Sequence, residues 1–259
     1  MRHISLPLLL CLPFGWCSAE TSGFSTEELE LAIKQEPTNK LLLLEISRRY
    51  HEKLLAGATE AVWKNAQRYF DLLGKQFRIH QKKKSGPVKP IALALHSSYK
   101  VLSAKRIKNS KSKIFNKYFV NTFLIGQGSA DLDIAVAAES KNLEIRLIRA
   151  RNAFAFPETK RLGIAITDLR YVITACEKDP RQAKGINVPE LYLIAGKCAS
   201  TTEDFIMAKE IWTLLRQKYS GSKEAEQALP LLTKNEPKAR RLRAIIENRL
   251  LNPPTNQEQ

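Results

Sequence analysis

The stretch NVPELYLIAGKCASTTEDFIMAKEIWTLLRQKYS, residues 187–220, decides the fold of this chain. Small and apolar residues recur within each half of it at spacings of three and four: Tyr192 and Gly196, then Ala208, Trp212 and Leu215. Such spacings place residues on one face of an α-helix. The segment therefore predicts two consecutive short helices, each with its own packing face.

These residues resemble one unit of the tetratricopeptide repeat (TPR) family, in its exported bacterial form of irregular helix pairs. In such a unit, two antiparallel helices pack through a small residue on the first helix and an alanine–aromatic pair on the second. The resemblance implies an all-α fold, a short right-handed α-solenoid of antiparallel helix pairs. The repeat-packing residues that it implies are Gly196, Ala208, Trp212, Leu215, Ala165 and Leu169.

Helical periodicity also predicts elements outside this unit, and no strand-like alternation of useful length appears. A first helix begins at Ser25, where Glu28 completes a capping box. Gly126 and Gly128 weaken the middle of the helix expected at 119–138. Pro230 is expected to end or kink one short helix, and Pro237 to precede another. The expected helices cover about 25–36, 39–55, 59–77, 91–104, 119–138, 143–156, 222–229 and 238–251. A further helix carries Ala165, Leu169 and Val172 and ends near Asp179.

The chain divides into three regions on this reading. Residues 1–19 have the pattern of a secretory signal, with Arg2 before an apolar run and Ala19 at a small-residue cleavage site. The apolar run is shorter than the roughly 20 residues that a membrane anchor needs. We therefore expect cleavage near Ala19 and export to the periplasm or the medium. A TPR-like domain at 20–233 and a basic helix with a disordered tail at 234–259 follow.

Cys176 and Cys198 remain once the signal is removed. An oxidising compartment permits them to pair. Two buried thiols that act as small apolar side chains are the equal alternative. Because there is no Cys-x-x-Cys pair, we expect no redox catalysis.

The chain is strongly basic, with a formal net charge of +16. Hydrophobic residues make up 44% of it and charged residues 26%, which is typical of an ordered globular protein. A positive surface attracts polyanions, and in an exported protein these are acidic proteins, anionic envelope polymers or membrane surfaces before nucleic acid. The candidate polyanion contacts are Lys105, Arg106, Lys108, Lys111, Lys113, Arg240 and Arg241.

The basic C-terminal helix alternates cations with apolar residues such as Leu242 and Ile246. This pattern fits a helix that lies on an anionic membrane. It equally fits one that caps the last layer of a solenoid. In either case its cations face solvent.

The TPR resemblance implies that ligands sit in a concave groove lined by the first helix of each pair. By that analogy the candidate groove contacts are Arg146, Arg149, Asn152 and Lys197. The alternative is that they are solvated side chains on an exposed helix face.

The sequence shows no convergent catalytic set, so we expect no enzymatic activity, metal or cofactor. His51, His80 and His96 lack the three- or four-residue spacing of a metal site. Asp131 and Asp133 are two residues apart and face different directions on a helix. We expect an exported, non-enzymatic TPR-like scaffold that binds another protein through its groove. The alternative is a cationic protein that attaches to anionic envelope polymer or membrane.

Overall fold

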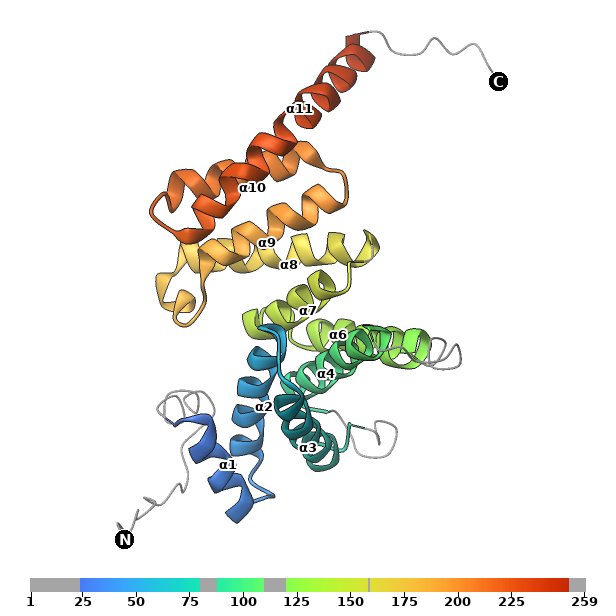
Figure 1. Ribbon diagram of the computed structural model, residues 1–259, viewed down its shortest axis with the longest axis vertical. Helices are drawn as coiled ribbons and strands as arrows, with labels where there is room; N and C mark the ends of the chain where they lie inside the picture. The colour runs from blue at the N-terminus through green and yellow to red at the C-terminus, as the bar shows by residue number, and fades with distance from the viewer. Residues whose placement is uncertain (1–23, 80–87, 110–119, 158, 252–259) are drawn as a thin grey trace. The chain divides into compact units, whose positions relative to one another are not determined.

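The computed structural model describes residues 24–79, 88–109, 120–157 and 159–251. Every regular element in these ranges is helical, which confirms the all-α class (Figure 1). The chain forms two compact units, unit 1 at residues 1–88 and unit 2 at residues 89–259. The predicted signal at 1–19 and the tail from 252 onward lie outside the described residues.

Unit 1 consists of α1 (Thr26–Gln35), α2 (Lys40–Leu55) and α3 (Glu60–Gln76). The predicted capping box is confirmed: the Glu28 amide donates to Ser25 Oγ over 3.2 Å, and the Ser25 amide donates to Glu28 Oε2 over 2.7 Å. Asn39 and Thr59 cap the next two helices with their side chains. These caps satisfy N–H groups that the first helical turn leaves unpaired, so they fix where each helix begins.

A stacked pair of tyrosines joins the helices of unit 1. The ring of Tyr50 on α2 lies 5.3 Å from that of Tyr69 on α3, and both side chains are buried. The Tyr50 hydroxyl donates to the carboxylate of Glu30 on α1. One aromatic side chain therefore contacts all three helices.

Unit 2 is a run of helices in which each packs on the next along the chain. In addition, α4 packs on α7, and α9 packs on α11. In Figure 1, α8, α9 and α10 lie as successive layers. The elements are α4 (Pro90–Asn109), the π-helix η2 (Val120–Gly126), α6 (Gln127–Ala138), α7 (Leu143–Ala155), α8 (Thr159–Lys178), the 3₁₀-helix η3 (Pro180–Ala183), α9 (Val188–Thr201), α10 (Phe205–Lys218) and α11 (Lys223–Leu251).

The two glycines expected to weaken the helix at 119–138 have other roles. Gly126 ends a π-helical turn, and α6 begins at the next residue. Gly128 lies where α6 meets α4, because a Cβ there would be 2.6 Å from Val101 Cγ2 and 3.0 Å from the Ser97 carbonyl oxygen. Glycine therefore permits a close approach of two helix backbones at this point.

The helix end expected near Pro230 and the separate helix expected after Pro237 are wrong, because α11 continues through both prolines. The prolines are seven residues apart and both are exposed, so they lie on one solvent-facing side of the helix. The carbonyls of Glu226 and Thr233, which lose their helical partners, can bond to water there. Burial of the other side of α11 holds the helix together. The domain boundary expected at 233/234 falls inside this helix.

The predicted helix pair at residues 187–220 is α9 and α10, joined by a short turn. Trp212 of α10 is 1% exposed, and its indole N–H donates to the Leu193 carbonyl over 3.3 Å. Its ring covers Gly196 of α9, where a Cβ would lie 2.5 Å from Trp212 Cε2. All six repeat-packing residues are buried in unit 2: Gly196, Ala208, Trp212, Leu215, Ala165 and Leu169.

Cys176 and Cys198 are both buried free thiols in this structure and form no disulfide with each other. Burial raises the pKa of Cys198 to about 12. Burial, followed by the charge of Glu177, also raises the pKa of Cys176. Neither thiol is therefore activated as a nucleophile.

We predict opposite effects for two Gly→Ala changes in helices. Gly196→Ala should lower the free energy of unfolding by about 1–3 kcal/mol, because the new methyl group overlaps the Trp212 ring. Gly163→Ala in α8 meets nothing within 4 Å. It should raise the free energy of unfolding by about 0.5–1 kcal/mol, because alanine favours the helix. Urea unfolding of both variants measures this difference, and equal effects would contradict the close approach at Gly196.

Candidate functional site

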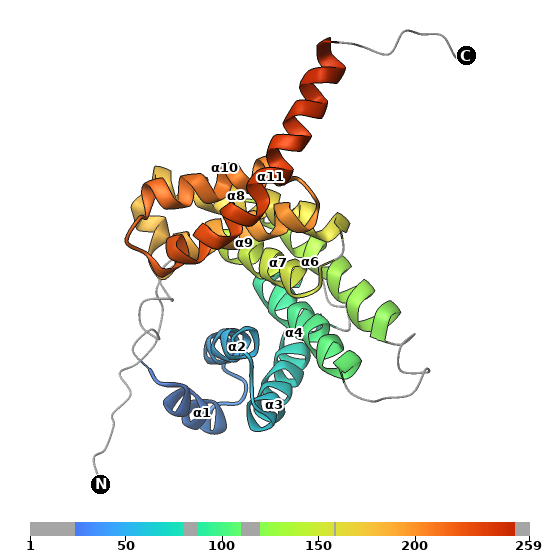
Figure 2. The ribbon, with the colours of Figure 1, turned by 45° about the horizontal axis from the view of Figure 1, so that its top comes forward.

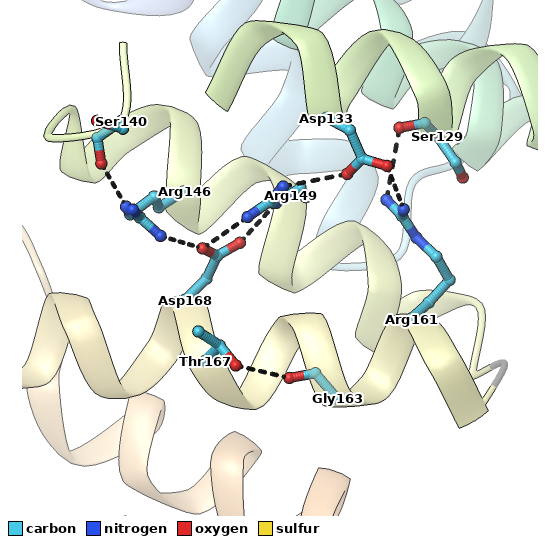
Figure 3. A network of polar contacts seen from close by, with 9 residues as sticks. All are labelled: Ser129, Asp133, Ser140, Arg146, Arg149, Arg161, Gly163, Thr167 and Asp168. Atoms are coloured by element: carbon cyan, nitrogen blue, oxygen red, sulfur yellow. Dashed lines mark hydrogen bonds and ion pairs between the residues drawn. The ribbon is translucent and has the colours of Figure 1, made fainter. Parts of the chain in front are cut away.

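Two predicted groove contacts, Arg146 and Arg149, point from α7 into a charged cluster between α6 and α8 (Figure 3). Asn142 caps α7 by accepting from the Ile145 amide over 3.2 Å. The cap fixes where the helix begins. Arg146 and Arg149, three residues apart on it, share one face.

Asp168 of α8 is the centre of this cluster, and its side chain is 0% exposed. Arg146 Nη1 donates to Asp168 Oδ1 over 2.6 Å. Arg149 forms a bidentate ion pair with Asp168, in which Nε donates to Oδ2 over 2.7 Å and Nη2 donates to Oδ1 over 2.9 Å. A buried carboxylate needs such partners, because leaving it unpaired costs several kcal/mol. Sequence reasoning missed Asp168, although an aspartate within the apolar stretch of a core helix is a signal for such a partner.

Asp133 extends the cluster to α6. Its Oδ1 accepts from Arg149 Nη1 over 3.1 Å, and its Oδ2 accepts from Arg161 Nη1 over 2.7 Å. Burial alone lowers the pKa of Arg149, but the hydrogen bonds and charges of Asp168 and Asp133 outweigh it and raise that pKa. The three helices are therefore joined by alternating charges.

The remaining groups of Arg146 are also used internally. Its Nε donates to the Ser140 carbonyl over 2.6 Å, and its Cζ lies 4.1 Å from the centroid of the Tyr171 ring. Its side chain is 14% exposed and that of Arg149 is 13% exposed. The cluster is suited to hold helices in register and leaves Asp168 no accessible oxygen.

Three of the four predicted groove contacts have internal partners in the structure. Arg146 and Arg149 bind internal carboxylates, and the solvated alternative fails for the same reason. Asn152 is 2% exposed and donates to Ser98 Oγ over 2.9 Å, which ties α7 to α4. Lys197 is partly exposed on α9 and stays a candidate.

A second polar cluster joins α8, α9 and α10. The Tyr192 hydroxyl donates to Glu177 Oε1 over 2.7 Å, and Lys218 Nζ lies 2.8 Å from both carboxylate oxygens. Burial alone raises the pKa of Glu177, but the hydrogen bonds from Lys218 and Tyr192 reverse this and lower it. The charged form of Glu177 is therefore favoured by folding.

The predicted polyanion contacts are divided between two helices. Lys105, Arg106 and Lys108 belong to α4, which continues to Asn109 instead of ending at 104, and Arg106 is exposed. Lys111 and Lys113 lie outside the described residues. Arg240 and Arg241 are exposed on α11, where Arg240 pairs with Glu236 over 3.3 Å.

The two halves of α11 have different surroundings. Ala225 and Ala228 belong to the core shared with α9 and α10, as a capping helix requires. Ala239 is the last buried residue among those whose side chains are described. Beyond it the helix extends past α10, with Ile245 and Ile246 42% and 43% exposed (Figure 2). The first half packs on α9 and α10, and the second half presents an amphipathic cationic surface.

Within the described ranges, no group of three or more His, Cys, Asp or Glu side chains could hold a metal ion. His80 is not among these residues. In the same ranges, no helix combines the length and the apolar character that crossing a bilayer demands. A comparison with known protein families, curated proteins and solved structures found no match.

We predict that Asp168→Asn lowers the free energy of unfolding by about 3–5 kcal/mol, because two mostly buried guanidinium groups lose their anion. Asp133→Asn is the matched control. Its side chain is 43% exposed, so the loss should be below about 1 kcal/mol. Urea unfolding compares the two variants. Similar losses would show that Asp168 is not the centre of the cluster.

We predict that Glu177 makes stability depend on pH in the acid range. Folding lowers the pKa of Glu177. The stabilisation by Glu177 is therefore complete above the pKa of this group in the unfolded chain, and it is lost as pH falls through the pKa in the folded protein. Glu177→Gln should therefore destabilise the protein at neutral pH and have little further effect below the folded pKa. Unfolding at a series of pH values tests this, with Glu226→Gln as an exposed control. A difference from wild type that persists unchanged in acid would contradict it.

Proposed function

We propose that the protein is an exported, non-enzymatic scaffold whose unit 2 forms a short right-handed TPR-like solenoid that binds another protein. The observation that carries this proposal is the packing of α9 on α10 through Gly196 and Trp212. It supports a helix pair of the kind that the TPR resemblance implies. A pair built in this way buries one face and needs a neighbour on the other, which favours stacking.

The order of contacts in unit 2 supports the same proposal. The helices α4, α7, α9 and α11 take the place of first helices, and α6, α8 and α10 that of second helices. First helices meet in α4 with α7 and in α9 with α11. Under this proposal the first helices line the binding surface in two stretches, α4 with α7 and α9 with α11. Lys197 of α9 is the remaining candidate contact from the sequence.

The charge of the chain indicates the chemistry of the partner. The cluster around Asp168 pairs three arginines with two aspartates internally, and the whole chain carries +16. An acidic protein is therefore the partner that the surface favours. The signal-like residues 1–19 place the encounter in the periplasm or the medium under this proposal.

A cationic protein that attaches to anionic envelope polymer or membrane is the second candidate. The exposed half of α11 favours it, because Arg240, Arg241 and Arg243 accompany exposed Ile245 and Ile246. Attachment of this kind depends on many charge contacts, so it weakens steeply with salt. A protein interface with an apolar centre weakens less.

The deciding experiment is capture from envelope extract with purified residues 20–259, at low and at high salt. We expect a discrete protein to be retained at high salt. Binding only to membrane or polymer fractions, lost at high salt, would replace the scaffold by the second candidate. If nothing is retained at either salt concentration, both proposals fail.

A further inference from the structure

A groove of about 450 Å³ lies between α10 and α11. Ile206 and Leu214 of α10 and Ala239 of α11 form its apolar part. Lys209 of α10 and Arg240 and Arg243 of α11 form its cationic part. This α10–α11 groove combines apolar surface with positive charge in one recess.

We propose that the α10–α11 groove binds an amphipathic α-helix of a partner protein, with an apolar stripe flanked by carboxylates. The inference rests on the proposed function in that it assumes a protein partner, but it assigns a surface other than the one lined by first helices. A helix that lays its apolar face into a groove is a common mode of protein recognition.

The groove lies where the packing of unit 2 stops. Among the described residues, α7 packs on α4, α6 and α8, and α9 packs on α8, α10 and α11, whereas α11 packs on α9 and α10. The helix that would cover α11 next is missing from these ranges. Leu214 is therefore 41% exposed, although it is aliphatic and adjoins the core residue Leu215. A docked helix would cover this uncovered side.

The charges around the groove select an acidic occupant. Three cations line it against one carboxylate, that of Glu210. Glu236 pairs with Lys209 over 3.0 Å and with Arg240 over 3.3 Å. Arg243 pairs with no carboxylate among the described residues and is exposed. Carboxylates on the partner helix would complement Arg243 and the excess positive charge of Lys209 and Arg240, which share one carboxylate.

Other occupants fit less well. A second copy that pairs symmetrically through the same surface would bring a like-charged α11 to the groove, which costs repulsion. Residues 252–259 contain no aliphatic or aromatic side chain and cannot supply an apolar stripe. A flat lipid surface can contact the exposed α11, but it follows a recess between two helices less closely than a docked helix does.

Binding of labelled synthetic helices to the purified protein tests the inference. The probe is a leucine–alanine helix with a glutamate-rich opposite face, and its control has lysine in place of every glutamate. Fluorescence anisotropy measures both, beside sedimentation with phosphatidylcholine–phosphatidylglycerol vesicles. We expect the acidic helix to bind and the basic one not to bind.

Two matched pairs of variants locate the binding. Arg243→Glu and Leu214→Glu change groove residues, whereas Arg241→Glu and Leu229→Glu make the same changes at exposed positions that do not line it. We expect the groove variants to weaken binding of the acidic helix about tenfold or more, and the controls less than about threefold. Unchanged thermal melts show that all four variants fold.

Three results would overturn the inference. The first is no binding of the acidic helix. The second is an equal loss in Arg243→Glu and Arg241→Glu, which would reflect net charge alone. The third is that neither helix binds, whereas vesicles bind and both arginine variants weaken the vesicle binding equally. This result would assign the surface to lipid. If Arg243→Glu and Leu214→Glu still retain the protein captured from envelope extract, the groove inference fails while the scaffold proposal stands.

Discussion

The buried carboxylate of Asp168 is the constraint on which the centre of unit 2 depends. It is 0% exposed and receives guanidinium groups from Arg146 and Arg149, the second of which also reaches Asp133 on α6. A charge in such a place is tolerated only while its partners keep their geometry. Hydrophobic contacts allow two helices to slide slightly along each other, but a bidentate ion pair does not. The cluster therefore fixes the register of α6, α7 and α8 more narrowly than their apolar faces could.

The sequence predicted those parts of the fold that depend on local chemistry. The capping box at Ser25 and the helix pair around Gly196 depend on residues that are close in sequence. Both can therefore be recognised from the sequence alone. Pro230 and Pro237 misled because the loss of two backbone bonds is local, whereas the burial that outweighs it comes from distant helices. Tertiary packing overrides local propensity in this way wherever one side of a helix is well covered.

The candidate site was harder to predict, because residue type does not reveal which side of a helix is covered. Arg146 and Arg149 have the spacing of an exposed stripe, yet their acceptor Asp168 comes from the following helix. Asn152 was misplaced for the same reason, since its acceptor Ser98 lies on α4. The number of arginines on α7 therefore overstates the positive charge that this helix exposes to a ligand. Exposed cations accompany exposed isoleucines on α11, which the sequence identified as amphipathic without showing where its packing ends.

The neighbour-to-neighbour packing of unit 2 has a consequence for how it folds. Nearly all helix contacts join elements that are adjacent or two apart in the described chain, so few long loops must close before native contacts form. Chains with such local contacts fold quickly, and their nuclei form where the connection is shortest. The pair α9 and α10, with its short turn and its buried tryptophan, is the natural place for that nucleus. Structure can then spread in both directions, as it does along linear arrays of repeats.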